Sequence, residues 1–177
     1  MMFTSLRNDS ITLNRLKTED DSLIYKALKS SITEISPWLS WLDQDYDQAS
    51  ASEFIKLQLN NWAQGIEYTY AIRDRAGKFV GVISLHMFDT QNDVASIGYW
   101  INSQSTCQGF CSQAVKLLVQ NALKPLNLIR IEIIVAIENK ASQRVAEKAG
   151  AIYEGVLKNR LRPKGIATDA KMYAIIQ

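Results

Sequence analysis

Hydrophobic and polar positions alternate along the chain with two different periods, and these periods predict its elements. The stretch SITLNRL, residues 10–16, alternates apolar and polar positions as a half-buried strand does. A helix is predicted to follow as far as about residue 30, with Thr18 as its N-cap and acidic residues in its first turn. Pro37 ends any helix before it, and a second helix is predicted from about Gln48 to Gln64.

From Tyr68 onward the period changes to two. Two strands joined by a turn at DRAG, residues 74–77, and a third strand at 93–101 predict an antiparallel meander. A helix over residues 111–123 is then predicted from one apolar face, formed by Cys111, Ala114, Val115, Leu118 and Ala122. The run LIRIEIIVAI, residues 128–137, is typical of a strand that is covered on both faces.

The C-terminal part predicts one more helix and a closing hairpin. The helix NKASQRVAEKAG, residues 139–150, should end at Gly150 as its C-cap. The hairpin should pair residues 151–157 with residues 169–176. The predicted order is β-α-α-β-β-β-α-β-α-β-β, which indicates one α/β (α+β) domain over residues 1–177 with a mixed, mostly antiparallel sheet.

Composition narrows the classes of function. The 177 residues, 47% of them hydrophobic, can bury one core. Lysine and arginine number 20 against 18 acids, so no basic surface for nucleic acid is expected. No apolar run reaches the roughly 20 residues that span a membrane, and MMFTSLRNDS lacks the apolar segment of a signal peptide. We therefore expect a cytoplasmic protein without a membrane or nucleic-acid partner.

The two cysteines, Cys107 and Cys111, are four positions apart, which matches neither a zinc site nor a redox CxxC pair. They are expected to be reduced thiols, and no metal site is predicted. Cys111 at a helix N-terminus could have a lowered pKa and act as a nucleophile, but the sequence offers no clear partner for it.

A candidate ligand site lies in IGYWINSQSTCQGFCSQAV, residues 97–115, where a strand passes through a polar loop into a helix. The first N–H groups of that helix lack intrahelical partners, and the helix dipole adds positive charge there. Gly109 would let a diphosphate approach the backbone, and no acid lies between Ile97 and Ala122. Alternatively, Gly109 is only a turn residue, with Gln108 and Ser112 as capping residues. The nucleotide motifs GxxxxGK[ST] and GxGxxG are absent from the sequence.

This run, together with VAIENKASQRVAEKAGAIYEGVLKN at residues 135–159, resembles the Gcn5-related N-acetyltransferases (GNAT), in particular the Rim-type enzymes that acetylate N-termini of ribosomal proteins. The most specific part is N-x-x-S-x-x-VAEKAGA-x-x-EG. The resemblance implies a GNAT-like sheet with helices on both faces and acetyl-CoA as co-substrate. The family's coenzyme motif, Q/R-x-x-G-x-G/A, reads TCQGFC here, so Thr106 and Cys111 depart from the pattern.

By this resemblance, the backbone amides from Gln108 to Gln113 would hold the pyrophosphate of acetyl-CoA. The end of the preceding strand would pair with the pantetheine arm, and Asn139 would bind the arm from the opposite side. The coenzyme-binding residues implied in this way are Trp100, Ile101, Gln108, Gly109, Phe110, Cys111, Ser112, Gln113, Asn139 and Ser142.

Acetyl transfer to an amine requires a base for the amine and an acid for the departing thiolate. Ser142 shares a helical face with apolar residues, so its hydroxyl stands where the pattern otherwise buries carbon. It either caps the helix or, like a similar serine in Rim-type enzymes, protonates the coenzyme sulfur. Tyr153 is a second candidate acid, or a core residue.

The base is less well defined by the sequence. Ser96 stands where many relatives carry Glu. His86 is the one histidine and is predicted to end a strand. It acts either as the base or in a structural role. Glu34 and Asp169 could also reach the cleft. An α-amine with pKa near 8 needs only about 1 kcal/mol to become neutral at pH 7, against about 4.6 for lysine, which favours a protein N-terminus.

Trp38 and Trp41 lie in the segment where related enzymes build the acceptor cleft, or they serve in the core or in a homodimer interface. The basic run KNRLRPKG, residues 158–165, would attract an acidic protein tail or form a solvated hairpin loop. The predicted function is acetylation of a protein N-terminus, and the resemblance implies that this protein is ribosomal. The alternatives are a small amine such as a polyamine or aminoglycoside, which several acids in the cleft would favour, or an acetyl-CoA-binding regulator without turnover.

Overall fold

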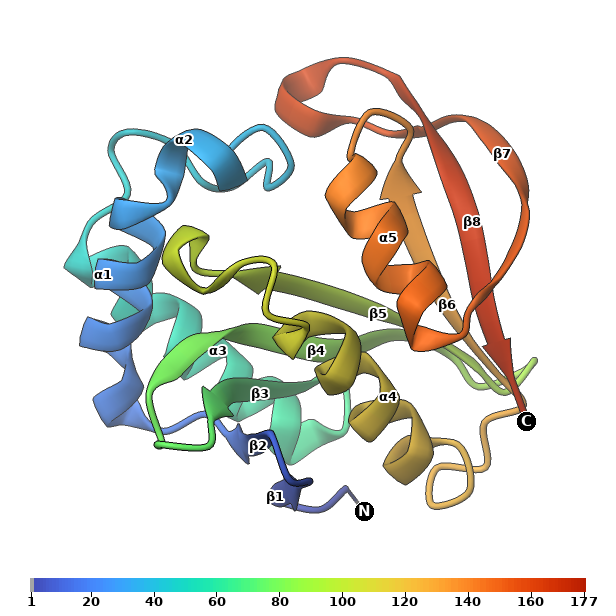
Figure 1. Ribbon diagram of the computed structural model, residues 1–177, viewed down its shortest axis with the longest axis horizontal. Coiled ribbons are helices and arrows are strands. Elements are labelled where there is room, and N and C mark those ends of the chain that lie inside the picture. The colour runs from blue at the N-terminus through green and yellow to red at the C-terminus, as the bar shows by residue number, and fades with distance from the viewer. Residues whose placement is uncertain (1) are drawn as a thin grey trace.

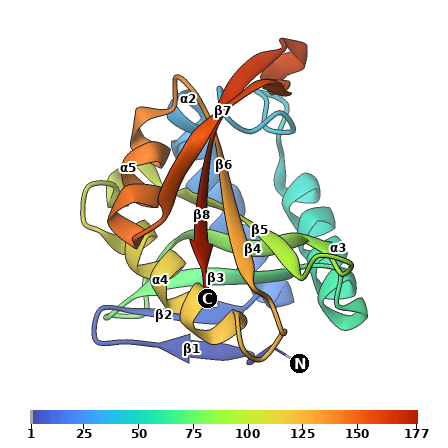
Figure 2. The same ribbon diagram turned by 90° about the vertical axis from the view of Figure 1, so that its right-hand side faces the viewer.

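An eight-stranded sheet runs through the part of the chain that the computed structural model describes, residues 2–177, and helices cover both of its faces (Figure 1, Figure 2). The strands are β1 (Ser5–Arg7), β2 (Ile11–Arg15), β3 (Tyr68–Asp74), β4 (Phe79–Asp89), β5 (Val94–Ile101), β6 (Arg130–Ala136), β7 (Ile152–Leu161) and β8 (Thr168–Ile176). The helices are α1 (Asp21–Ser30), α2 (Ile32–Ile35), α3 (Gln48–Gln64), α4 (Phe110–Ala122) and α5 (Lys140–Ala149). None of the helices in residues 2–177 is long and apolar enough to cross a membrane.

The strand order is β1-β2-β3-β4-β5-β6-β8-β7. Neighbouring strands are antiparallel except β5 and β6, which run parallel. Two apolar cores result because each face of the sheet is covered by its own helices. On one face Leu118 of α4 packs in a cluster with Ile97 of β5. On the other face Ile55 of α3 packs in a cluster with Val82 of β4.

The parallel pair β5–β6 forms a fork. The two strands are in register only where Val94–Ser96 lies opposite Arg130–Glu132. Beyond Ser96, β5 remains paired with β4 as far as Ile101, while β6 remains paired with β8 as far as Ala136. Figure 1 shows the two strands diverging, with α5 on the side of β6. The open arm of β5 therefore has unpaired backbone groups that face the gap.

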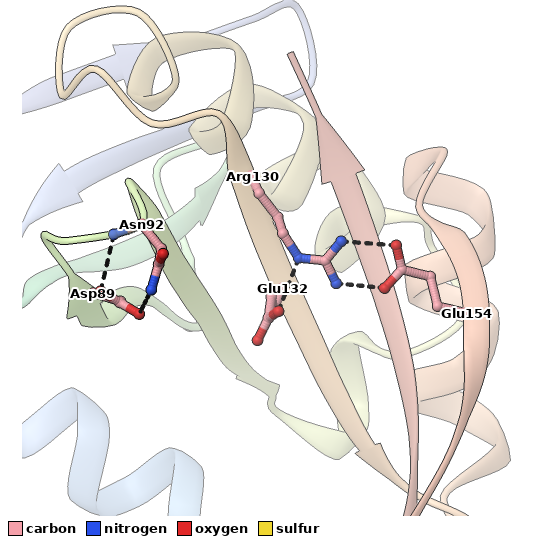
Figure 3. A network of polar contacts seen from close by, with 5 residues as sticks. All are labelled: Asp89, Asn92, Arg130, Glu132 and Glu154. Atoms are coloured by element: carbon pink, nitrogen blue, oxygen red, sulfur yellow. Dashed lines mark hydrogen bonds and ion pairs between the residues drawn. The ribbon is translucent and has the colours of Figure 1, made fainter.

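Polar contacts join the strands at the closed end of this fork (Figure 3). Arg130 of β6 donates from Nε to Glu132 at 2.8 Å, and its two terminal nitrogens bind the carboxylate of Glu154 on β7. The bond to Arg130 lowers the pKa of Glu154. In the neighbouring turn, Asn92 donates to Asp89 at 2.7 Å. Because β8 lies between β6 and β7, the Arg130–Glu154 pair ties three strands together.

The predicted order of elements was incomplete in two places. Strand β1 was not predicted, because its three residues, which pair with β2 and bury only Leu6, are too few to show a period. It also missed α2, a single turn that ends before Pro37. The remaining elements, the mixed sheet and the two-sided helix cover are confirmed, including α3 and the αL C-cap at Gly150.

Three local predictions were wrong. Thr18 is not an N-cap, because it lies within a 3-10 turn before α1, in which the Asp20 carboxylate accepts a hydrogen bond from the Lys17 N–H at 3.0 Å. His86 does not end its strand, because β4 continues to Asp89. The run 158–165 is not all loop, because its first four residues belong to β7.

Candidate active site

The turn from β5 to α4 passes through a glycine in the left-handed conformation. Gly109 is the residue before the first turn of α4 and has φ of 80°, which favours glycine. A Cβ at Gly109 would meet no atom within 4 Å, so the surface over this residue is open. Within residues 2–177 no side chain caps α4. Ser112 instead donates its hydroxyl to the Gly109 carbonyl at 3.0 Å, so the capping alternative for it is wrong.

The amides at this turn are available, with one exception. The N–H of Gln113 donates to the Gly109 carbonyl at 3.1 Å and is used by the helix. The predicted cradle is therefore confined to the amides from Gln108 to Ser112. Cys107 is an exposed free thiol, whereas Cys111 is a buried one. Burial raises the pKa of Cys111, which contradicts the idea of a nucleophilic thiolate at this position.

A pair of hydroxyl groups spans the open part of the fork. The Tyr99 hydroxyl on β5 lies 3.0 Å from Oγ of Ser142 on α5 and 3.1 Å from the Ser142 carbonyl oxygen. Asn139 caps α5 by accepting a hydrogen bond from the Ser142 N–H at 3.0 Å. The cap is thus supplied by Asn139, and the Ser142 side chain is held by Tyr99 instead. The Ser142 hydroxyl, on the apolar face of α5, therefore has Tyr99 as its partner, and this contact ties α5 to β5.

The hydroxyl pair can carry a proton toward the fork. Burial is the main cause that raises the pKa of Tyr99, with Cys111 adding to it and the bond to Ser142 opposing it. Tyr99 therefore keeps its proton at neutral pH. If Tyr99 donates to Ser142 Oγ, the Ser142 proton is free to point into the gap between β5 and β6. This arrangement suits a general acid that is replenished by its neighbour.

A cavity of about 1000 Å³ opens on the opposite face of the sheet. Its floor comes from β3, β4 and β5, and its walls come from α3 and from the chain between α2 and α3. His86 lies in this floor. A Cβ at Gly98 would lie 3.0 Å from His86 Nε2, so the glycine leaves the space that the imidazole needs over β5. The imidazole therefore lies beside the strand that forms one arm of the fork.

His86 has the properties of a base. Burial lowers its pKa, and the negative charge of Glu67 partly opposes that shift. A lowered pKa leaves the imidazole neutral at pH 7 and able to accept a proton. Glu67 accepts a hydrogen bond from the Asn61 side chain at 3.5 Å, and it lies 3.2 Å from the Thr69 hydroxyl, whose single proton goes either to Glu67 or, at 2.7 Å, to the buried Gln58. The carboxylate is thus placed where it can stabilise an imidazolium.

The other predicted acceptor and catalytic residues are dispersed. Trp41 lines the cavity, whereas Trp38 and Glu34 do not, and Glu34 instead accepts a hydrogen bond from Ser103 at 3.0 Å. Asp169 lies on β8, where it binds Lys158 at 2.8 Å. Ser96 is buried opposite His86, in the closed part of the fork.

Tyr153 on β7 is half exposed, which contradicts its assignment to the core. It is in ring contact with Tyr173 of β8, at 5.5 Å between ring centroids. Tyr153 therefore lies on the surface of the β7–β8 hairpin and not beside the hydroxyl pair of the fork.

Several residues of the site had not been singled out from the sequence. Tyr99 carries a hydroxyl on a strand face that otherwise presents Ile97 and Ile101, the same kind of anomaly that drew attention to Ser142. Glu67 and three further acids of the cavity wall, Asp43, Asp45 and Glu53, had no such signal. Their segments read as ordinary polar surface, and only their convergence on one cavity distinguishes them.

A sheet that forks beside an uncapped helix N-terminus has an open strand edge and free backbone N–H groups, which suit an extended, anionic ligand. The chain belongs to the acetyltransferase (GNAT) domain family, which matches residues 10–152, and it is therefore an N-acetyltransferase. It is 28% identical to YdaF of Bacillus subtilis (strain 168), named as a candidate ribosomal N-acetyltransferase, over 99% of this chain and 96% of that protein. The ribosomal-protein-serine acetyltransferase of Escherichia coli (strain K12) is 24% identical over 96% of this chain and 94% of that protein.

Solved structures show the same fold. RimL, a ribosomal L7/L12 α-N-protein acetyltransferase solved in complex with coenzyme A, superposes with a TM-score of 0.89 at 21% identity, covering 97% of both chains. The microcin C7 self-immunity acetyltransferase MccE, solved with acetyl-CoA and AMP, superposes with a TM-score of 0.90 at 23% identity, covering 96% of this chain and 94% of that one.

Proposed function

We propose that this enzyme transfers the acetyl group of acetyl-CoA to the N-terminal α-amine of a protein. The observation that carries the proposal is the placement of two chemical groups on opposite faces of one fork. The Tyr99–Ser142 pair lies on the α5 side, and His86 lies in the open cavity on the other side. Relatives named as acetyltransferases of ribosomal proteins support a ribosomal protein as acceptor.

Acetyl-CoA fits the described residues. The open surface over Gly109 and the free amides from Gln108 to Ser112 suit the pyrophosphate. The unpaired edge of β5, around Trp100 and Ile101, suits the amides of the pantetheine arm, with Asn139 across the gap. When bound, the coenzyme supplies an activated thioester at the mouth of the cavity.

The protein's own groups would then move two protons. His86 takes a proton from the ammonium of the acceptor, and the resulting imidazolium is stabilised by Glu67. The neutral amine would form the new C–N bond as the C–S bond breaks, and the nitrogen would release its second proton to water. Ser142 would give its proton to the thiolate and regain one from Tyr99, and Tyr99 would be reprotonated from solvent when the products leave. An α-amine suits this arrangement because its deprotonation at pH 7 costs only about 1 kcal/mol, which a single, partly buried histidine can offset.

A small polycationic amine is the second candidate acceptor, and one observation favours it. The cavity is lined by four acids, Asp43, Asp45, Glu53 and Glu67, and by no lysine or arginine of the described residues 2–177. Such a wall attracts cations in general. It is the feature that the sequence analysis had tied to a polyamine or another amino compound. A homodimer, in contrast, remains a prediction that sedimentation analysis can test.

Thiol release from acetyl-CoA tests these candidates directly. The acceptors are peptides with a free N-terminus, the same peptides with a blocked N-terminus and an internal lysine, and polyamines. Release only with free N-termini is expected, and it should be lost in Ser142→Ala. Release with polyamines alone would make the small-amine enzyme the better account. Calorimetric binding of acetyl-CoA with no release from any amine would instead indicate a regulator without turnover.

A further inference from the structure

One polar side chain lies on the buried face of α5, immediately after Ser142. Gln143 shares that face with Ala146 and Ala149 and is only 5% exposed. A glutamine at a position that otherwise buries alanine is unfavourable unless its amide is hydrogen-bonded. The partners of this amide therefore indicate what the side chain does.

Both ends of the Gln143 amide have partners, and these partners belong to two different strands. Nε2 donates to the carbonyl oxygen of Ile137 at 2.7 Å, and the carbonyl oxygen of Ala136, the last residue of β6, is 3.5 Å away. Oε1 accepts a hydrogen bond from Nζ of Lys171 on β8 at 3.0 Å. Lys140 also reaches the Ile137 carbonyl, at 2.8 Å, but from the exposed side. Gln143 thus joins α5 to the end of the open arm of β6 and to the next strand of the sheet.

Lys171 determines which way the amide of Gln143 points. An ammonium group can only donate, so it must face Oε1, and Nε2 is then turned toward the carbonyls at the end of β6. Within residues 2–177 Lys171 forms no ion pair with an acid. Its Nζ lies 5.4 Å from the centroid of the Tyr153 ring, which also attracts the cation. Because a charged donor makes a stronger hydrogen bond than a neutral one, Lys171 holds the amide firmly in this orientation.

The first turn of α5 also carries the groups that face the gap of the fork. The side chain of Asn139 accepts a hydrogen bond from the Ser142 N–H at 3.0 Å, and its carbonyl accepts one from the Gln143 N–H at 3.1 Å. Ser142 meets Tyr99 across the gap, beyond the point where β5 and β6 cease to pair. The position of α5 over the gap therefore depends on side-chain contacts, and Gln143 supplies a buried one to β6.

We infer that Gln143 is a positioning residue for acetyl transfer: held by Lys171, it fixes the first turn of α5 on β6 so that Asn139 and Ser142 face the coenzyme. The inference rests on the proposed roles of Asn139 and Ser142, and it applies whichever amine accepts the acetyl group. Gln143 itself does not touch the reacting atoms. A displacement of a catalytic group by about 1 Å can slow a reaction about 10²-fold, so the loss of this support should be measurable in kcat.

Two substitutions of Gln143 separate positioning from packing. Gln143→Met has a side chain of similar length and loses both partners. Gln143→Glu keeps the shape and the contact with Lys171, but the ionised carboxylate cannot donate to the Ile137 carbonyl. In both variants single-turnover kcat should fall about tenfold or more, whereas KM for the acceptor, which binds on the opposite face of the sheet, should stay within about twofold. Lys171→Met should lower kcat less, because the amide can still reach the Ile137 carbonyl.

Matched controls and a double-mutant cycle show whether the effect acts through Ser142. Gln120→Met changes an exposed glutamine of α4, and Lys148→Met changes an exposed lysine in the last turn of α5. Both controls should keep the kcat of the natural chain. In the Ser142→Ala background, Gln143→Met should slow kcat little further, because the hydroxyl that it positions is already gone. A purely structural loss would instead lower kcat by the same factor in both backgrounds.

Coenzyme binding gives a second readout that does not need turnover. Because Asn139 lies on the same turn as Ser142, calorimetry should show weaker binding of acetyl-CoA to Gln143→Met than to Gln120→Met. A crystal structure of Gln143→Met should show the hydroxyls of Tyr99 and Ser142 beyond hydrogen-bond distance of each other.

Two results would overturn the inference: Gln143→Met with the kcat and coenzyme affinity of the natural chain, or a loss of kcat that is equally large in the Ser142→Ala background. Both are distinct from failure of the proposed function, in which no amine releases thiol from acetyl-CoA. In that case calorimetry of acetyl-CoA with the same variants still decides. Binding that is weaker in Gln143→Met and unchanged in Gln120→Met supports the positioning role, and equal binding to the two variants refutes it.

Discussion

Replacing Ser142 by alanine should slow acetyl transfer far more than it destabilises the protein. The change removes the 3.0 Å contact between Oγ and the Tyr99 hydroxyl, whose single proton can then be donated to the Ser142 carbonyl at 3.1 Å. A hydrogen bond to a developing thiolate contributes about 1.5–3 kcal/mol, which corresponds to a fall in kcat of about 10- to 150-fold. The loss of one neutral hydrogen bond lowers the melting temperature by only about 2–4 °C.

A double-mutant cycle with Tyr99→Phe distinguishes the residue that donates a proton to the thiolate from the residue that replaces that proton. If Ser142 gives the proton and Tyr99 replaces it, Tyr99→Phe should slow kcat less than Ser142→Ala does. The double variant should then be little slower than Ser142→Ala alone, because the two hydroxyls act as one unit. Tyr153→Phe is the matched control, since it removes a tyrosine hydroxyl that is half exposed on β7 and outside the pair.

The assay is single-turnover thiol release with saturating acetyl-CoA and a free N-terminal peptide, followed beside thermal unfolding of each variant. Single-turnover conditions isolate the chemical step from product release. Two outcomes would refute the assignment. In one, Ser142→Ala keeps kcat within about twofold while the melting temperature falls, which would make the hydroxyl purely structural. In the other, Tyr99→Phe abolishes turnover and Ser142→Ala does not, which would make Tyr99 the acid.

Four further predictions follow from other parts of the structure. Burial lowers the pKa of His86 below its ordinary 6.5, so kcat/KM should fall only as pH drops through that lowered value. The free energy of unfolding should decline below pH 6.5, because the unfolded chain binds the proton more readily than the folded one. Glu67→Gln should shift the acid limb of the pH–rate profile to still lower pH, and a limb that stays in place would show that the carboxylate does not act on the imidazole. Gly109→Ala meets no clash but holds alanine at φ of 80°, so about 1 kcal/mol of stability should be lost and KM for acetyl-CoA should rise, as measured by thermal unfolding and coenzyme titration. Arg130→Met removes the contacts to Glu132 and Glu154 at the closed end of the fork, and it should lower the free energy of unfolding by about 1 kcal/mol in urea; an unchanged midpoint would mean that the network is only superficial.

Most elements could be predicted from local patterns because apolar residues recur along the sequence with the period of the helix or strand that buries them. The helix from Gln48 to Gln64 and the αL cap at Gly150 depend on neighbours only a few residues away. The exceptions had too little local signal, as β1 shows, or a competing local structure, as the 3-10 turn at Thr18 shows. His86 was predicted to end a strand, yet β4 continues beyond it through its pairing with β5.

The sequence alone determined the family, the glycine turn before α4 and the serine on α5, because each rests on residues that are close together along the chain. Only the tertiary structure decided what surrounds the chemistry. Tyr99 meets Ser142 across 43 positions, and the acids of the cavity come from segments that are separate in the chain. Such contacts depend on how helices pack on a twisted sheet and where β5 leaves β6, and no local period encodes that geometry.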